Sequence, residues 1–253
     1  MKIHLSTRNL NMKKILAFSF CLILVPGLLI AQKKTTEKKQ QQMIDLSNRA
    51  NDHILLQLGY TNWTGKPDSL MTNGLSKSIN AYFMFDFPFK TNPNLSIAVG
   101  AGIASDHILF SNTYIGIKDL TSDLRFTNMS DTNHYKKTKL ATNYLEAPVE
   151  FRYSAHPVTG KGLKAAIGVK VGLLVNAHTR NTKYADRNNN TINDYTLKET
   201  DKRFFNTTRI SGMARIGLGH ISIFGSYAFT PLLKDGSGPE MRPFSIGITL
   251  SGL

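Results

Sequence analysis

Residues 79–89 read Ile-Asn-Ala-Tyr-Phe-Met-Phe-Asp-Phe-Pro-Phe, with an apolar side chain at every odd-numbered position. In an extended chain these odd-numbered residues share one face, whereas Asn80 and Asp86 lie on the other. Alternation with a period of two predicts a β-strand that has one apolar face. A soluble sheet that buries this face against a second layer has the same pattern. The rest of the chain therefore has to separate a membrane barrel from a soluble sandwich.

Seven further segments share this pattern, at about residues 53–62, 95–104, 144–153, 165–176, 209–218, 221–229 and 244–251. In most of them the second face is charged or is small and polar, which does not suit the core of a sandwich. Short turns at residues 90–93, 157–160 and 219–220 alternate with long connectors at 63–77, 105–143, 178–205 and 231–241. Such alternation is typical of outer-membrane barrels. The sequence predicts an all-β fold, an eight-stranded antiparallel transmembrane β-barrel over residues 52–253, with the soluble sandwich as the alternative.

The N-terminus has the features of a secretory signal. Lys13 and Lys14 precede an apolar run over residues 15–30, and the small residue Ala31 follows before Gln32. This order predicts a signal peptide over residues 1–31, with Met12 as an alternative start. An uncleaved anchor is the other interpretation, although the run is short for a membrane-spanning helix. Residues 32–51 are polar and lack an apolar period, so we expect a periplasmic tail there.

Cysteine content and charge limit the chemistry of the exported chain. Cys21 is the only cysteine and lies inside the predicted signal, so no thiol or disulfide would remain after cleavage. The formal charge of the full chain is +14, and the exported part stays basic. Nucleic acid is not an expected partner outside the cytoplasm, whereas the phosphates of lipopolysaccharide are.

Four segments carry a family resemblance: Tyr-Leu-Glu-Ala-Pro-Val-Glu-Phe-Arg-Tyr at 144–153, Arg-Ile-Gly-Leu-Gly at 215–219, Tyr-Ala-Phe-Thr-Pro-Leu at 227–232 and Phe-Ser-Ile-Gly-Ile at 244–248. Together they resemble the PorT-like outer-membrane β-barrel family of Bacteroidota, over the chain from about Asp52. The resemblance implies an exported barrel of the cell envelope, and some members of that family belong to secretion machinery. It implies no particular activity, because most members have none assigned.

Charged residues on the second faces of the strands would point into the barrel. Eight strands enclose an interior that side chains just fill, so no open channel is expected. Because a charge in a narrow lumen is costly unless it is paired, we expect a structural ion-pair network there. The predicted members are Asp86, Glu146, Glu150, Arg152, Lys170, Arg209 and Arg215. A catalytic pair of Glu146 and Glu150 is disfavoured, because four residues along a strand span roughly 13 Å, beyond the ~5 to 9.5 Å of glycosidase pairs.

Other motifs do not predict catalysis, a cofactor or a metal site. Residues 186–191 resemble the start of an EF-hand loop, but Thr191 replaces the required Gly and Leu197 the required Glu, so we expect a solvated loop. The histidines lack metal-ligand spacing. His107 and His178 lie near the outer rim, where acyl-chain enzymes on small barrels need a Ser or His. Aromatic residues near strand ends are predicted interface anchors, namely Tyr60, Trp63, Tyr82, Phe89, Tyr153 and Tyr227.

The sequence therefore predicts a non-enzymatic β-barrel of a Gram-negative outer membrane, with extracellular loops and periplasmic termini. Its expected role is structural or interactive, as a component or partner of a secretion or surface complex. The expected partners are outer-membrane lipid including lipopolysaccharide, an envelope protein, and the barrel assembly machinery during biogenesis. A small-solute channel is the second interpretation, and a lipid-modifying enzyme is the third.

Overall fold

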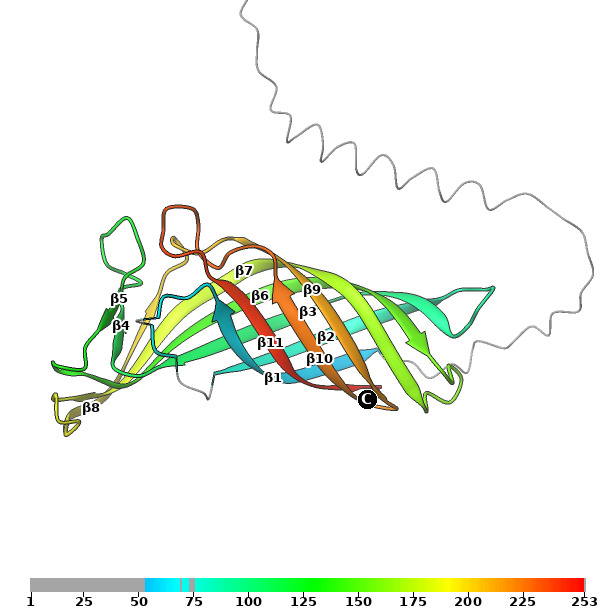
Figure 1. Ribbon diagram of the computed structural model, residues 1–253, viewed down its shortest axis with the longest axis horizontal. Coiled ribbons are helices and arrows are strands. Elements are labelled where there is room, and N and C mark those ends of the chain that lie inside the picture. Colours follow the sequence, from blue (N-terminus) through cyan, green and yellow to red (C-terminus); the bar gives the residue numbers. More distant parts are fainter. Residues whose placement is uncertain (1–52, 69, 73–75, 253) are drawn as a thin grey trace, which may run out of the picture. The chain divides into compact units, whose positions relative to one another are not determined.

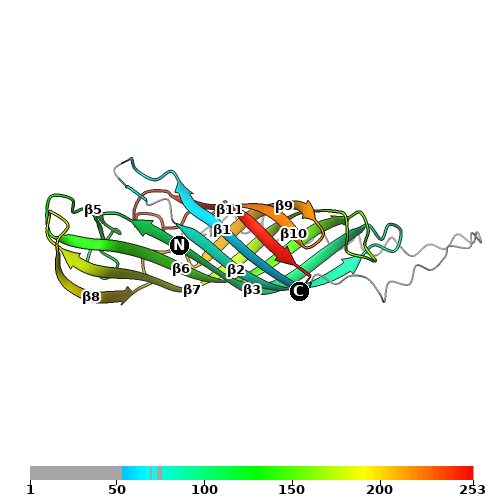
Figure 2. The ribbon, with the colours of Figure 1, turned by 90° about the horizontal axis from the view of Figure 1, so that it is seen from below.

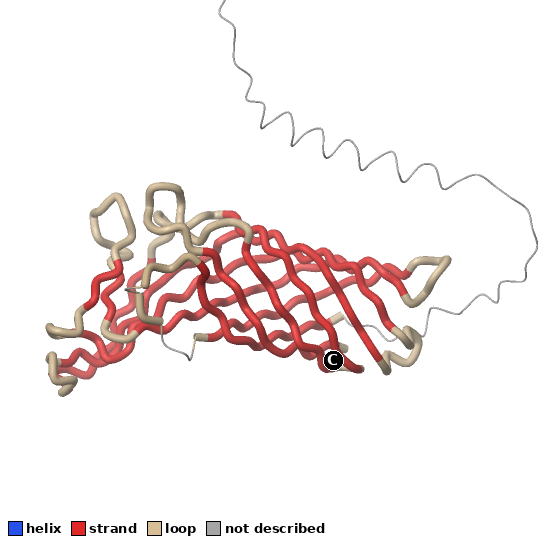
Figure 3. Tube along the Cα trace, viewed as in Figure 1, coloured by secondary structure: helices blue, strands red, loops and turns tan. Residues whose placement is uncertain are grey.

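The computed structural model describes residues 53–68, 70–72 and 76–252. The predicted signal peptide at 1–31 and the tail at 32–51 lie outside the described residues. In the described part no helix is long and apolar enough to cross a membrane. Figure 3 shows strands joined by loops that gather at the two ends of the sheet.

Eight strands pair in a closed antiparallel ring (Figure 1). They are β1 (Ile54–Thr64), β2 (Lys77–Pro88), β3 (Leu95–Phe110), β6 (His134–Ser154), β7 (Leu163–Ala185), β9 (Thr208–Leu218), β10 (Ile221–Ala228) and β11 (Arg242–Ser251). Neighbours follow the order β6-β3-β2-β1-β11-β10-β9-β7, and the pairing of β6 with β7 closes the ring. The predicted all-β, antiparallel architecture is confirmed.

The two faces of the ring are inverted relative to a soluble protein. On the outer face, Ile103 and Ile167 are 61% and 65% exposed, whereas Ser96 and Thr249 on the inner face are fully buried. A soluble sandwich would bury its apolar faces between the sheets. Since the apolar side chains lie outside and the polar ones inside, the soluble-sandwich alternative is excluded, and the outer face is suited to contact lipid.

The long connectors are more regular than the sequence indicated. The prediction of loops at 105–143 and 178–205 was wrong, because β3, β6 and β7 continue well beyond the apolar band. The same regions also contain a small hairpin of β4 (Thr113–Ile115) with β5 (Phe126–Asn128), and β8 (Thr191–Thr200), which pairs with the outer half of β7. Figure 2 shows β6, β7 and β8 extending together past the ring. Outside lipid neither face has to be apolar, so the alternation disappears while the backbone pairing continues.

A tight turn at residues 186–190 joins β7 to β8. The Asp186 carboxylate accepts hydrogen bonds from the backbone N–H groups of Asn188 (2.9 Å) and Asn190 (2.8 Å). Both bonds lower the pKa of Asp186, and the bond from Asn190 has the larger effect. Asn189 has a φ of 66°, a left-handed conformation that Asn tolerates better than most residues. The resemblance to an EF-hand loop therefore reflects the Asp and Asn content of a turn.

Candidate functional site

Glu146 on β6 is the centre of one cluster of charges in the lumen. Its carboxylate accepts hydrogen bonds from Arg209 Nη2 on β9 (2.7 Å) and from the Tyr82 hydroxyl on β2 (2.5 Å). Lys170 Nζ on β7 lies 3.2 Å from the same carboxylate. Arg209 also donates through Nη1 to Asp106 on β3 (2.5 Å). One guanidinium thus connects two carboxylates, and the cluster joins five strands of the ring.

Glu150, four residues further along β6, forms a second cluster. Its Oε2 accepts hydrogen bonds from Arg152 Nε (2.6 Å) and Arg215 Nη2 on β9 (3.1 Å). Arg152 Nη1 lies 3.8 Å from Asp86 on β2, which also accepts a hydrogen bond from the Ser96 hydroxyl on β3 (2.7 Å). Glu146 and Glu150 therefore belong to different clusters, and each has cationic partners of its own.

The seven lumen residues named from the sequence all take part in these two clusters. An eighth, Asp106, was missed, because the alternation had placed the end of its strand at residue 104. With Asp106 the two clusters hold four acids and four bases. Glu146 and Glu150 are each only 1% exposed, so their charges depend on these partners rather than on bulk water. We name the eight residues the lumen network.

An apolar plug closes the ring at the end of the long connectors. Its residues come from strand ends and from each long connector. The main members are Trp63, Leu70, Phe110, Ile115, Ile117, Leu124, Tyr144, Leu174, Phe204, Phe205, Leu232, Leu233 and Met241. Trp63 packs on Phe110 with ring centroids 5.6 Å apart. The guanidinium of Arg209 lies 3.8 Å from the centre of the Tyr144 ring, so the lumen network meets the plug there.

Two of the predicted interface anchors have other positions. Trp63 is 5% exposed in the plug, and Tyr82 is 3% exposed in the lumen, where it donates to Glu146. The prediction failed for both because each side chain occupies an inward position, Trp63 an odd-numbered one of β1 and Tyr82 an even-numbered one of β2. The other four, Tyr60, Phe89, Tyr153 and Tyr227, are exposed on the outer surface.

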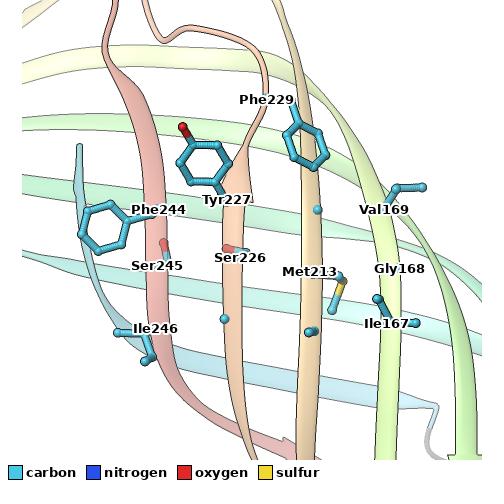
Figure 4. Close-up of a pocket in the computed structure, with 13 residues that line it drawn as sticks. Ile167, Gly168, Val169, Met213, Ser226, Tyr227, Phe229, Phe244, Ser245 and Ile246 are labelled. Atoms are coloured by element: carbon cyan, nitrogen blue, oxygen red, sulfur yellow. The ribbon is translucent and has the colours of Figure 1, made fainter. Parts of the chain in front are cut away.

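The outer face carries a groove of about 780 Å³ across β7, β9, β10 and β11 (Figure 4). Gly212, Ala214 and Gly225 are its small outward-facing residues, and the larger apolar residues around it are Ile167, Val169, Tyr227, Phe229, Phe244 and Ile246. A Cβ at Gly212 would lie 2.8 Å from Cζ of Phe229, whereas one at Gly225 would meet nothing within 4 Å. The groove opens away from the lumen, so it is suited to apolar chains and offers no route for solutes.

A Ser–His pair lies on the outer face above the apolar band. Ser105 Oγ is 2.9 Å from His107 Nε2 and donates a hydrogen bond to Asn143 Oδ1 (2.6 Å). His178 Nδ1 is 2.7 Å from Asn176 Oδ1. Burial and neighbouring cations lower the pKa of both histidines. Among the described residues, no group of three or more His, Cys, Asp and Glu is arranged to hold a metal ion.

Comparison with known proteins agrees with this geometry. A family model described as "Outer membrane protein beta-barrel domain" matches residues 30–233. The chain belongs to this family. Its place is therefore the outer membrane, as predicted. No curated protein matches the chain significantly. Among solved structures, Ail, the attachment invasion locus protein of Yersinia pestis, is similar, with 9% sequence identity, a TM-score of 0.34, and coverage of 78% of this chain and 95% of Ail.

Proposed function

We propose that this outer-membrane protein is a non-enzymatic barrel that conducts no solutes and acts in the cell envelope through its long-connector end. Its role is that of a structural element or of a partner in a secretion or surface complex, as its resemblance to PorT-like proteins implies. The observation that supports this proposal is the double closure of the lumen. Charge pairs fill the middle of the ring, and the apolar plug covers one end.

The proposal includes an orientation in the membrane. Short turns face the periplasm in barrels of this kind, and long connectors face outward. The ring has an even number of strands, so both of its ends, Ile54 and Ser251, lie on the side of the short turns. We therefore place the termini in the periplasm and the plug, with β4, β5 and β8, outside the cell.

Conductance in planar bilayers tests the closed lumen. The full chain is inserted beside a general porin as a positive control, and we expect no stepwise current above that of the empty bilayer. Current steps comparable to those of the porin would contradict the proposal and favour a small-solute channel. Affinity purification from native outer membranes, with an untagged strain as the control, then tests for an envelope protein partner. Recovery of the barrel without any stoichiometric protein would favour a structural role.

The contact between Ser105 and His107 is the observation on which the third interpretation, a lipid-modifying enzyme, would have to rest. Ser105 donates its proton to Asn143, so that proton is not directed at His107 Nε2, which lies 2.9 Å from the hydroxyl oxygen. A general base would instead accept the serine proton. His107 Nδ1 is buried and has no hydrogen-bond partner among the described residues, so nothing there orients the ring as a triad requires. Release of fatty acid from radiolabelled lipid by the wild type, abolished in Ser105→Ala, would establish the enzyme. Equal background rates would support the non-enzymatic proposal.

A further inference from the structure

A row of three cations crosses the outer face where β6, β7 and β8 extend beyond the ring. Lys139 pairs in register with Arg180, and Arg180 pairs with Lys198. One row nearer the membrane, Lys77 of β2 pairs with His107 of β3. His178 of β7 lies in the same row, because Ala141 pairs with both histidines. We name Lys77, His107, Lys139, His178, Arg180 and Lys198 the basic patch.

A register shift keeps the patch on one face. The pairing of β6 with β7 shifts between Asn143 and Tyr144, which adds one residue, Val175, to β7. Above this bulge the even-numbered residues of β7 face outward, so His178 and Arg180 join Lys139 on the outer surface. Without the extra residue these two side chains would point to the inner face of the sheet.

No acid balances the cations of the patch within the described part of the chain. Lys77, Arg180 and Lys198 are exposed, and none of the four cations forms an ion pair with a described residue. The acids adjacent in sequence face the other side: Asp106 binds Arg209 in the lumen, and Glu199 pairs with the buried Thr179. Burial lowers the pKa of Lys139, and the other three cations lower it further. Like charges directly opposite on neighbouring strands destabilise a sheet, so an anion bound here would relieve a real repulsion.

The patch begins where the apolar band ends. Along β2, the last outward apolar residue is Ile79, and Lys77 follows about 7 Å further on at ~3.3 Å per residue. Along β7, Val175 is 59% exposed, and Arg180 lies about 16 Å beyond it. A lipid anchored in the band therefore has its head group against the patch. This inference rests on the proposed function, because the orientation puts the patch at the outer leaflet.

The geometry points to the basic patch as a binding site for the phosphorylated saccharide head group of an outer-leaflet glycolipid. The head-group layer of an ordinary phospholipid bilayer is only about 5 to 7 Å deep on each side. Barrel strands tilt about 40° from the membrane normal, so about 7 and 16 Å along a strand correspond to about 5 and 12 Å of height above the band. Such a layer therefore reaches Lys77 but not Arg180. A phosphorylated disaccharide carries anionic groups further from the acyl chains, and guanidinium and ammonium groups bind phosphate through charge-assisted hydrogen bonds. The two rows of the patch are spaced to contact a head group of this larger kind.

Lipid binding by the purified full chain in detergent tests the inference. The probes are diphosphoryl lipid A, dephosphorylated lipid A, phosphatidylglycerol and inorganic phosphate, followed by native mass spectrometry. The test variant is Lys139→Gln/Arg180→Gln/Lys198→Gln. The matched control, Lys90→Gln/Lys118→Gln/Lys161→Gln, removes the same charge from exposed sites away from the patch.

We expect the wild type and the control to prefer diphosphoryl over dephosphorylated lipid A at least tenfold. Each cation near an anionic surface changes affinity roughly fivefold, so the test variant should lose most of this preference. Lys139→Arg/Lys198→Arg should keep it, because it retains the charge. An unchanged preference in the test variant would overturn the inference, as would equal affinity for phosphatidylglycerol or full displacement by millimolar inorganic phosphate. Trypsin cleavage after Arg187 in intact cells tests the orientation separately, so failure of the proposed orientation is distinguishable from failure of this inference.

Discussion

Replacing Arg209 with alanine is the sharpest test of the lumen network. The change removes the donor of three hydrogen bonds, two to Glu146 and one to Asp106. Glu146 keeps Lys170, but Asp106 loses the cation that neutralises it while it remains 6% exposed. Breaking a buried ion pair from one side costs about 3 to 5 kcal/mol, because a charge is left uncompensated. We expect Arg209→Ala to lower the free energy of unfolding by that amount.

Reversible urea unfolding in lipid vesicles measures this effect. Trp63 is the only tryptophan of the chain and is packed in the plug, so its fluorescence reports the folded loop end. The double variant Arg209→Met/Asp106→Asn removes charge from both sides and should recover part of the loss. Arg180→Ala is the control. Arg180 is exposed and unpaired among the described residues, so its loss should change stability by no more than about 0.5 kcal/mol.

Equal stability of Arg209→Ala and Arg180→Ala within about 0.5 kcal/mol would contradict this expectation. A double variant less stable than Arg209→Ala would contradict it as well. Either result would mean that water solvates the lumen carboxylates well enough to replace the guanidinium. The network would then be a consequence of the fold without stabilising it.

Three further predictions test the outer surface. Ile248→Arg should lower the free energy of unfolding by about 2 to 4 kcal/mol, because the side chain at this position faces lipid. The same urea titration measures this loss. Trypsin added to intact cells should cut after Arg187 in the turn and spare Lys137 of β6, which pairs with Thr182 of β7. Gly225→Val should be tolerated since it faces open space, whereas Gly212→Val has to displace the exposed tip of the Phe229 ring and should lower the free energy of unfolding by up to about 1 kcal/mol, again measured by urea titration.

Each of these predictions has an outcome that contradicts it. A neutral Ile248→Arg would mean that β11 does not face lipid at that position. Protection of Arg187 in intact cells, with cleavage only after the outer membrane is opened, would reverse the proposed orientation. Equal effects at the two glycines would mean that the Phe229 ring does not cover Gly212.

The barrel strands were predictable because lipid imposes a strict rule on the sequence. Outward residues in the band are mostly apolar and inward ones mostly polar or small, so Phe83 and Asn80 were assigned to opposite faces from their positions alone. The charges of the lumen followed from the same rule. Asp106 was missed only because the run of apolar residues on the opposite, outward face of β3 stops at Ile103.

The extensions and the plug were not predictable by this rule. Beyond the band, Lys139 and Arg180 occupy outward positions of paired strands, yet their charges suggested a loop. Plug residues such as Leu70 and Phe205 are isolated apolar residues in polar connectors, and their burial depends on contacts between connectors far apart in the sequence. The basic patch depends on the bulge at Val175, which brings even-numbered residues of β7 to the outer face. No pattern in one segment contains that information.

The plug and the lumen network support each other physically. Ion pairs strengthen when water is excluded, because the local dielectric constant falls. The plug excludes water from one end of the lumen, and Arg209 contacts both the carboxylates below it and the Tyr144 ring that belongs to the plug. Without the lumen network, the plug would lie over unpaired polar groups, which is costly. Arg209 thus brings the lumen network into contact with the plug, which is built in part from the long connectors. Their outward residues form a surface whose shape is set before any lipid or protein binds, which limits the entropy lost on binding.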